Sequence, residues 1–163
     1  NAMYGLQYTA LRYFNVYGPR MDVFGAYTEG MIRWLDAIDS WVPPKIFGKG
    51  DQTMDFVYVG DVARANILAM ESQNTNIALN IGSSAETSLT GLLDTMLAIT
   101  GSTIQPEYHP ERKVNPVPRR LADISRAKYE IGFEAEVSLE DGLTELIKWR
   151  EGVKNTKQNM VLK

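Results

Sequence analysis

The segment LRYFNVYGPR, residues 11–20, determines how the rest of the chain is arranged. Its first part is aromatic, aliphatic or β-branched, which is typical of a strand, and Tyr-Gly-Pro then marks a turn. An apolar strand that leads into a polar loop is typical of a parallel α/β sheet, whose ligands bind outside the carboxyl ends of the strands. Asn15 and Arg20 lie at that end, with an amide that donates and accepts and a guanidinium that suits phosphate oxygens. The same residues also suit a plain buried strand followed by a surface arginine.

The composition is that of one globular domain. The chain has 163 residues, 44% of them hydrophobic, which is enough to bury a core. Its net charge is −3, and it has no long basic run that would form a surface for nucleic acid. No apolar run reaches the roughly 18 residues that cross a bilayer and no signal peptide is visible, so we expect no membrane association and a cytoplasmic location. Because the chain lacks cysteine and His109 is its single histidine, we expect no thiolate or histidine metal site and no Ser-His-Asp triad.

Hydrophobic spacing predicts alternating strands and helices after the opening strand. Helical spacing occurs in 31–38, 62–70, 89–97, 124–130 and 139–149, and strand patterns occur in 45–47, 55–59, 77–81 and 103–108. Asp61 is a predicted N-cap, and Ser138-x-x-Asp141 resembles a capping box. Gly101 and Gly132 are predicted C-terminal stops.

Three blocks of the sequence resemble the extended short-chain dehydrogenase/reductase family, and within it the NAD-dependent nucleotide-sugar epimerases and dehydratases (UDP-glucose 4-epimerase-like). They are the opening segment, then FGKGDQTMDFVYVGDVARA at 47–65, and LADISRAKYEIG at 121–132 together with the helix at 138–149. The resemblance implies an α/β fold that is the C-terminal part of a Rossmann-like enzyme, with its final sheet strands and a small α/β substrate-binding subdomain. Residues 3–150 then form this substrate-binding portion. Residues 1–2 read as an expression-tag remnant, and the polar segment 151–163 as a disordered tail.

The motifs that such enzymes use for cofactor binding and chemistry are not found in the sequence. The family begins with a Gly-rich strand-turn-helix that binds NAD, and it reacts through a Tyr-x-x-x-Lys pair; the chain contains neither motif. Tyr8 is followed four positions later by Arg12 rather than by lysine. The resemblance therefore implies NAD in the full-length parent enzyme, but no cofactor, no catalytic residue and no activity in this portion alone.

The resemblance assigns five residues to binding a nucleotide sugar, of which a UDP-sugar is the simplest choice. Asn15 is expected to bond a phosphate oxygen, and Arg20 to help neutralise the diphosphate. Phe47 is expected to lie against the base, although a plain core position suits it equally. Relatives carry an arginine in the loop before residue 121 that grips the nucleotide, for which Arg112 is the first choice and Arg119 the second. A solvated basic loop is the alternative for both.

Met54 departs from the family pattern, because relatives usually carry arginine there to reach the diphosphate. A thioether cannot supply a charge-assisted hydrogen bond, so either another arginine supplies the charge or the substrate is held differently. The reaction of the parent stays open between epimerisation, dehydration, decarboxylation and reduction. A non-catalytic binding or oligomerisation module is the alternative function, because an open sheet exposes an edge that can pair with a second copy.

Overall fold

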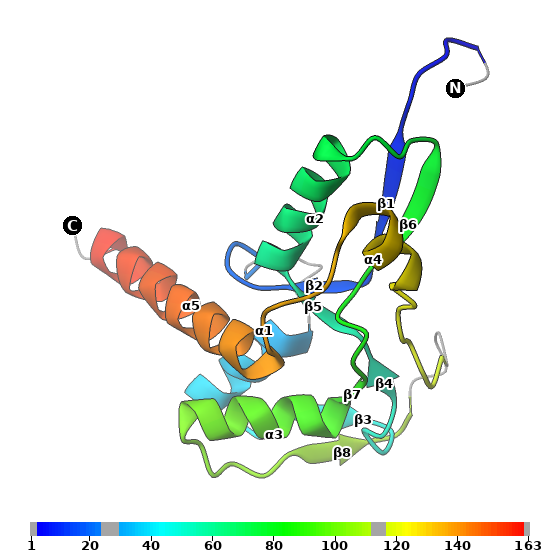
Figure 1. Ribbon diagram of the computed structural model, residues 1–163. Coiled ribbons are helices and arrows are strands. Elements are labelled where there is room, and N and C mark those ends of the chain that lie inside the picture. The colour runs from blue at the N-terminus through cyan, green and yellow to red at the C-terminus, as the bar shows by residue number, and fades with distance from the viewer. Residues whose placement is uncertain (1–2, 24–29, 112–116, 162–163) are drawn as a thin grey trace.

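The computed structural model describes residues 3–23, 30–111 and 117–161, and two parallel strand pairs lie at its centre (Figure 1). Strand β1 (Thr9–Tyr13) pairs with β6 (Ile77–Ile81), and β2 (Asn15–Tyr17) pairs with β5 (Phe56–Tyr58). Helices connect the parallel strands, as parallel pairing requires. These pairs confirm the predicted α/β class.

The opening segment forms two strands rather than the single strand that we predicted. At their junction, the amide of Phe14 donates to the carbonyl oxygen of Ile81 at 2.9 Å. The next amide, that of Asn15, donates to the carbonyl oxygen of Asp55 at 3.2 Å. The chain therefore passes from one strand pair to the other at Asn15, which places this polar side chain where the two pairs meet.

Two hydrophobic cores lie on the two faces of the β2–β5 pair. The first core joins this pair to β1, β6, helix α2 (Val59–Glu71) and helix α4 (Ser125–Ile131), which share one half of the molecule (Figure 1). Its buried residues are Val57, Val62, Ala65, Leu79, Ile81, Ala127, Ile131 and Phe133. Because successive strand side chains point to opposite faces, Val57 belongs to this core while its neighbours in β5 pack against the other.

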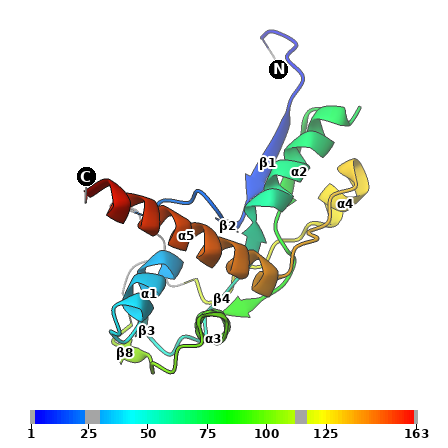
Figure 2. The same cartoon turned by 90° about the vertical axis from the view of Figure 1, so that its left-hand side faces the viewer.

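The second core is formed mainly by three helices: α1 (Gly30–Asp39), α3 (Leu89–Thr100) and α5 (Leu139–Val161) (Figure 2). Its buried residues are Tyr17, Met31, Ile32, Trp34, Leu35, Ile38, Ile46, Leu92, Leu93, Met96, Leu143, Leu146 and Ile147. These side chains recur at three- and four-residue spacing along each helix, which is the pattern of one apolar face. The apolar spacing predicted for all three helices is therefore buried as expected.

Two short strand pairs lie beside the second core. Strand β3 (Lys45–Phe47) pairs in parallel with β8 (Glu107–His109). Strand β4 (Thr53–Met54) pairs antiparallel with β7 (Thr87–Ser88). Figure 1 shows both pairs next to α3. They frame one side of the cleft described below.

The predicted C-terminal stops of α3 and α4 and the predicted cap at the start of α5 are found in the structure. Gly101 and Gly132 follow α3 and α4 with φ of 66° and 68°, a left-handed conformation that glycine adopts at little cost. At α5, the amide of Asp141 donates to Oγ of Ser138 at 3.1 Å, and that hydroxyl donates to the Asp141 carboxylate at 2.6 Å. Ser138 therefore caps α5 as predicted, while the Asp141 carboxylate contacts the Ser138 hydroxyl rather than the backbone N–H that completes a capping box.

The predicted role of Asp61 as an N-cap is wrong. Helix α2 begins at Val59, directly after β5, so Asp61 lies inside its first turn. The side chain is buried, and its two carboxylate oxygens accept from the amides of Glu136 and Val137, each at 3.1 Å. Asp61 thus anchors the segment that leads into α5 instead of capping its own helix.

Helix α5 continues to Val161, into the polar segment that we expected as a disordered tail. The ammonium of Lys154 lies 2.6 Å from the carboxylate of Asp39, so α5 contacts α1 beyond residue 150. Within the described residues, no helix combines the length and the apolar character that crossing a bilayer requires.

Candidate binding cleft

A cleft of about 950 Å³ lies between β2, α1, β3 and β4. Asn15 of β2, Phe47 of β3 and Met54 of β4 all line it, together with Arg33 of α1 and Lys45 of β3. Most of the other lining side chains in the described part are apolar, as in typical small-molecule sites. The structure thus brings together two of the residues assigned from the sequence, Asn15 and Phe47.

Asn15 is held in place by a side-chain hydrogen bond. Its Nδ2 donates to the carbonyl oxygen of Asp55 at 2.8 Å, in addition to the backbone bond between the same residues. An amide nitrogen carries two hydrogens, so a second donor remains for a ligand. The arrangement orients the amide at the cleft wall.

Phe47 lies half-buried at the opposite wall. Its ring packs against that of His109, its partner in the β3–β8 register, with centroids 5.5 Å apart and planes tilted by 36°. The ring is therefore neither a fully buried core residue nor a freely exposed one. The residue also lines the cleft.

Of the three arginines assigned from the sequence, the two that the structure describes do not line the cleft. Arg20 is exposed after β2 with φ of 72° and does not line the cleft. Arg119 makes a two-pronged ion pair with Glu86, at 2.5 Å and 2.9 Å, and is largely exposed. Hydrogen bonds from Arg119 and then from Thr53 hold the pKa of the Glu86 carboxyl below its usual value. Arg112 lies outside the described residues.

Asp55 is a structural residue of the site that sequence reasoning missed. Its completely buried carboxylate accepts four hydrogen bonds. The donors are the amide and hydroxyl of Ser83 at 2.6 and 2.7 Å, the amide of Ser84 at 2.9 Å and the amide of Ala122 at 3.1 Å. Because its own carbonyl oxygen holds Asn15, Asp55 connects the cleft to the loop after β6 and to the segment before α4. The polar–apolar alternation around it suggested only an ordinary half-buried strand.

Tyr17 lines the cleft as a neutral donor. Its hydroxyl donates to the carbonyl oxygens of Ser138 and Leu139, each at 3.4 Å. Burial first, and then the nearby carboxylate of Asp61, raise the pKa of Tyr17 far above its ordinary value. The hydroxyl therefore stays protonated at neutral pH, and its role is to fix the start of α5.

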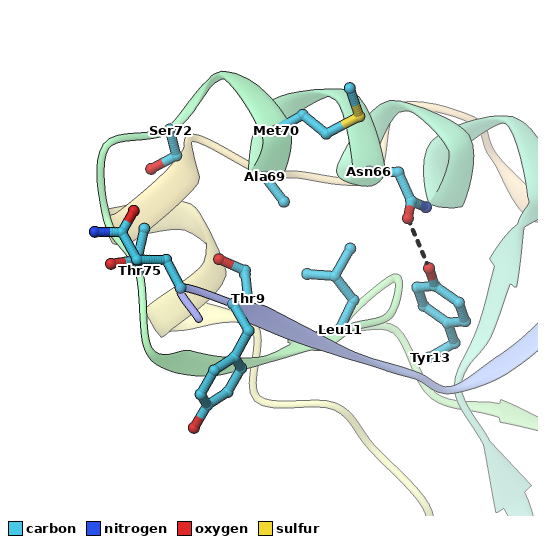
Figure 3. Close-up of a pocket in the computed structure, with 10 residues that line it drawn as sticks. Thr9, Leu11, Tyr13, Asn66, Ala69, Met70, Ser72 and Thr75 are labelled. Atoms are coloured by element: carbon cyan, nitrogen blue, oxygen red, sulfur yellow. Dashed lines mark hydrogen bonds between the residues drawn. The ribbon is translucent and has the colours of Figure 1, made fainter. Parts of the chain in front are cut away.

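A second, smaller groove of about 460 Å³ lies between β1 and α2 (Figure 3). The hydroxyl of Tyr13 donates to Oδ1 of Asn66 across it at 3.0 Å. Leu11 and Met70 also line it, and no ionisable acid or base does so among the described residues apart from tyrosine. Within the same residues, no three His, Asp or Glu side chains meet in a way that would hold a metal ion.

The chain matches a protein-family model and curated proteins. A family model described as the NAD dependent epimerase/dehydratase family matches residues 1–82. A putative UDP-glucose 4-epimerase of Methanocaldococcus jannaschii is 38% identical over 157 residues, which are 96% of this chain and 50% of that protein. The chain spans about half the length of the curated relatives it matches.

Solved structures match the fold as well as the sequence. UDP-glucose 4-epimerase of Thermotoga maritima, crystallised with UDP-glucose, is 39% identical with a TM-score of 0.86, over 93% of this chain and 48% of that chain. UDP-glucuronic acid 4-epimerase of Bacillus cereus, in complex with UDP-glucuronic acid and NAD, is 29% identical with a TM-score of 0.79, over 88% of this chain and 45% of that chain.

Proposed function

The chain belongs to the NAD dependent epimerase/dehydratase family, and on that basis we propose that it is the substrate-binding portion of an NAD-dependent nucleotide-sugar epimerase or dehydratase. Its ligand is a nucleotide sugar, with a UDP-sugar as the first choice, because the relatives described above are named for or bound to UDP-sugars. The observation that carries the proposal is the single cleft lined by both Asn15 and Phe47.

The cleft offers each part of such a ligand a suitable contact. Phe47, which lines the cleft, is the proposed contact to the base, and aromatic contacts of this kind tolerate any base. The amide of Asn15, fixed by Asp55, keeps one N–H for a phosphate oxygen. Arg20, Arg112 and Arg119 remain proposed contacts from outside the cleft lining. The lining between these groups is mostly apolar, and a surrounding of low polarity strengthens polar contacts.

The described residues do not fit the pyrophosphate of NAD by themselves. A dinucleotide site needs a Gly-rich turn between a strand and a helix, so that the backbone can approach the phosphates. Here β5 runs into α2 through Tyr58 and Val59, with Gly60 as the one glycine, already inside the helix. We therefore propose that NAD and the reacting residues belong to the other half of the enzyme, and that this chain alone is catalytically inert.

Binding of UDP-glucose by the purified chain tests this proposal. In isothermal titration calorimetry we expect saturable binding, weakened about tenfold by Phe47→Ala because a stacking contact is lost. Tyr129→Ala is the matched control, since Tyr129 is an aromatic residue on α4 that is 87% exposed. With NAD added, interconversion of UDP-glucose and UDP-galactose should stay at background. Absence of saturable binding would overturn the binding role, and turnover above background would overturn the inertness.

A second candidate, an interaction module, is favoured by the free edge of β1. Within the described residues β1 has β6 as its one strand neighbour, and Tyr8 and Tyr13 of this strand region are 48% and 46% exposed. An unpaired edge beside exposed aromatic rings can pair with a second copy of the chain. This function predicts a mass that rises with concentration in sedimentation and no heat with UDP-glucose. The substrate-binding function predicts heat of binding with UDP-glucose, whatever mass sedimentation gives.

A further inference from the structure

The charged side chains that line the cleft are cations. Arg33 and Lys45 line it, and no carboxylate does so in the part of the chain that the structure describes. The whole chain carries a net charge of −3, so the cleft is locally opposite in sign to the protein. A cleft of one sign with low-dielectric walls concentrates ligands of the other sign. Lys45 therefore gives the cleft a positive group that favours an anion.

Strand β3 presents one of these cations beside the aromatic ring. Alternate residues of a strand share a face, so Lys45 and Phe47 point toward the cleft while Ile46, fully buried, points into the second core. Their Cα atoms are roughly 7 Å apart, as two strand residues of one face must be. A planar ring and an ammonium group at this spacing suit a ligand in which a base is joined to a phosphate by one sugar.

The backbone around Lys45 is held from two sides. Lys45 is paired with Glu107 in the β3–β8 register, and its carbonyl oxygen accepts from Nε1 of Trp34 in α1 at 2.9 Å. The side chain itself is exposed, and its ammonium makes no ion pair with any described residue. The charge is therefore placed by a fixed backbone and remains available to a ligand.

The other positive groups assigned from the sequence that the structure describes are less suited to binding a phosphate in the cleft. The guanidinium of Arg119 already holds both carboxylate oxygens of Glu86. Arg20 does not line the cleft, and Met54, which does, carries no charge. Granting the proposed function, we infer that Lys45 binds the phosphates of the nucleotide in place of the arginine that the family resemblance places at position 54. Arg33 is the second cation of the same cleft.

The inference is tested by comparing UDP with uridine, which share a base and a ribose but differ in charge. In calorimetric titrations of the purified chain, Lys45→Gln should weaken UDP binding about tenfold, the usual effect of losing one charge-assisted contact. Uridine binding should change less than about twofold, because no phosphate is present. Lys49→Gln is the matched control, since Lys49 is an exposed lysine in the turn after β3 that does not line the cleft. It should bind UDP as the unaltered chain does.

Moving the positive charge to another residue of the same cleft separates an effect on binding from an effect on structure. Adding Met54→Arg to Lys45→Gln should restore most of the affinity for UDP, because the charge returns from a neighbouring strand of the same cleft. Equal UDP affinity of Lys45→Gln and the unaltered chain would overturn the role of Lys45 while leaving the proposed function intact. Equal losses for UDP and uridine would show a structural effect and also overturn it. If the unaltered chain binds no UDP, the proposed function itself fails.

Discussion

Asp55 illustrates at the scale of single residues how the cleft is kept in shape. Its carboxylate accepts from Ser83, Ser84 and Ala122, and its carbonyl oxygen accepts from Asn15. A buried carboxylate is stable only when such donors surround it. Gly82 shows how tight the arrangement is, since an added Cβ would lie 2.8 Å from the Asp55 carboxylate. One residue thus ties two segments, the loop after β6 and the segment before α4, to the residue that we propose contacts phosphate.

Asp55→Asn should destabilise the fold by roughly 3 kcal/mol, because an amide NH₂ would face amides that need an acceptor. The free energy of unfolding, measured by urea denaturation, checks this. Asp51→Asn, at an exposed carboxylate a few residues earlier, should change it by less than about 0.5 kcal/mol. Equal stability of the two variants would show that the hydrogen bonds to Asp55 contribute little.

The sequence identified residues that line the cleft better than the residues that support it. Asn15 and Phe47 could be assigned because they stand in blocks that resemble a family, and the structure places both at one cleft. Asp55 could not, because its four donors come from segments about 28 to 67 positions away in sequence. A usable signal is the small-residue run Gly82-Ser83-Ser84 after a strand, which leaves room for a buried acceptor.

At the scale of elements, an ion-pair network fixes α5 against α1. Arg150, 3% exposed, pairs with Asp36 and, at 2.6 Å, with Asp39, and Lys154 adds a contact to each. Helical spacing predicted both helices, and the structure confirms that they are helical. The C-terminal end of α5 was harder to predict, because after residue 150 this helix has no run of apolar residues at helical spacing and is held against α1 by ion pairs. Helix α2 begins earlier than predicted, at Val59. In the sequence, Val59 and Gly60 resemble the end of the preceding strand.

This network makes the docking of α5 sensitive to acid. Burial would raise the pKa of Asp39, but hydrogen bonds from Lys154 and Arg150 outweigh it and hold the pKa below its usual value of 3.8. Ionised Asp39 therefore stabilises the folded state above about pH 3.8, and this contribution is lost as the pH falls toward the lower folded-state pKa.

Asp39→Asn should remove that part of the acid sensitivity. We expect the free energy of unfolding to fall less steeply below about pH 4 in this variant than in the unaltered chain. Urea denaturation across a pH series measures it, with Asp94→Asn on α3, also an exposed carboxylate, as the control. If Asp39→Asn follows the same pH curve as the unaltered chain, the network does not contribute to acid stability.

At the scale of the whole molecule, the described residues hold both the cleft and the free edge of β1. The β2–β5 pair separates the two cores, and the cleft lies next to the second core. We therefore expect the cleft to keep its shape whether or not another strand covers the free edge of β1. The fold class and the family could be predicted because three sequence blocks span most of the chain. An exposed sheet edge was expected from the sequence, but the strand that carries it and the groove of Figure 3 follow only from knowing which strands pair.

The most direct test of the account is to map UDP-glucose binding residue by residue. In ¹⁵N–¹H correlation spectra of the labelled chain, we predict saturable shifts for the amides of Asn15, Phe47 and Gln52, which line the cleft. Amides along the β1–α2 groove, such as those of Asn66 and Thr75, should stay in place. Shifts confined to the groove, or no saturable shift at all, would contradict the claim that this chain carries the nucleotide-sugar site.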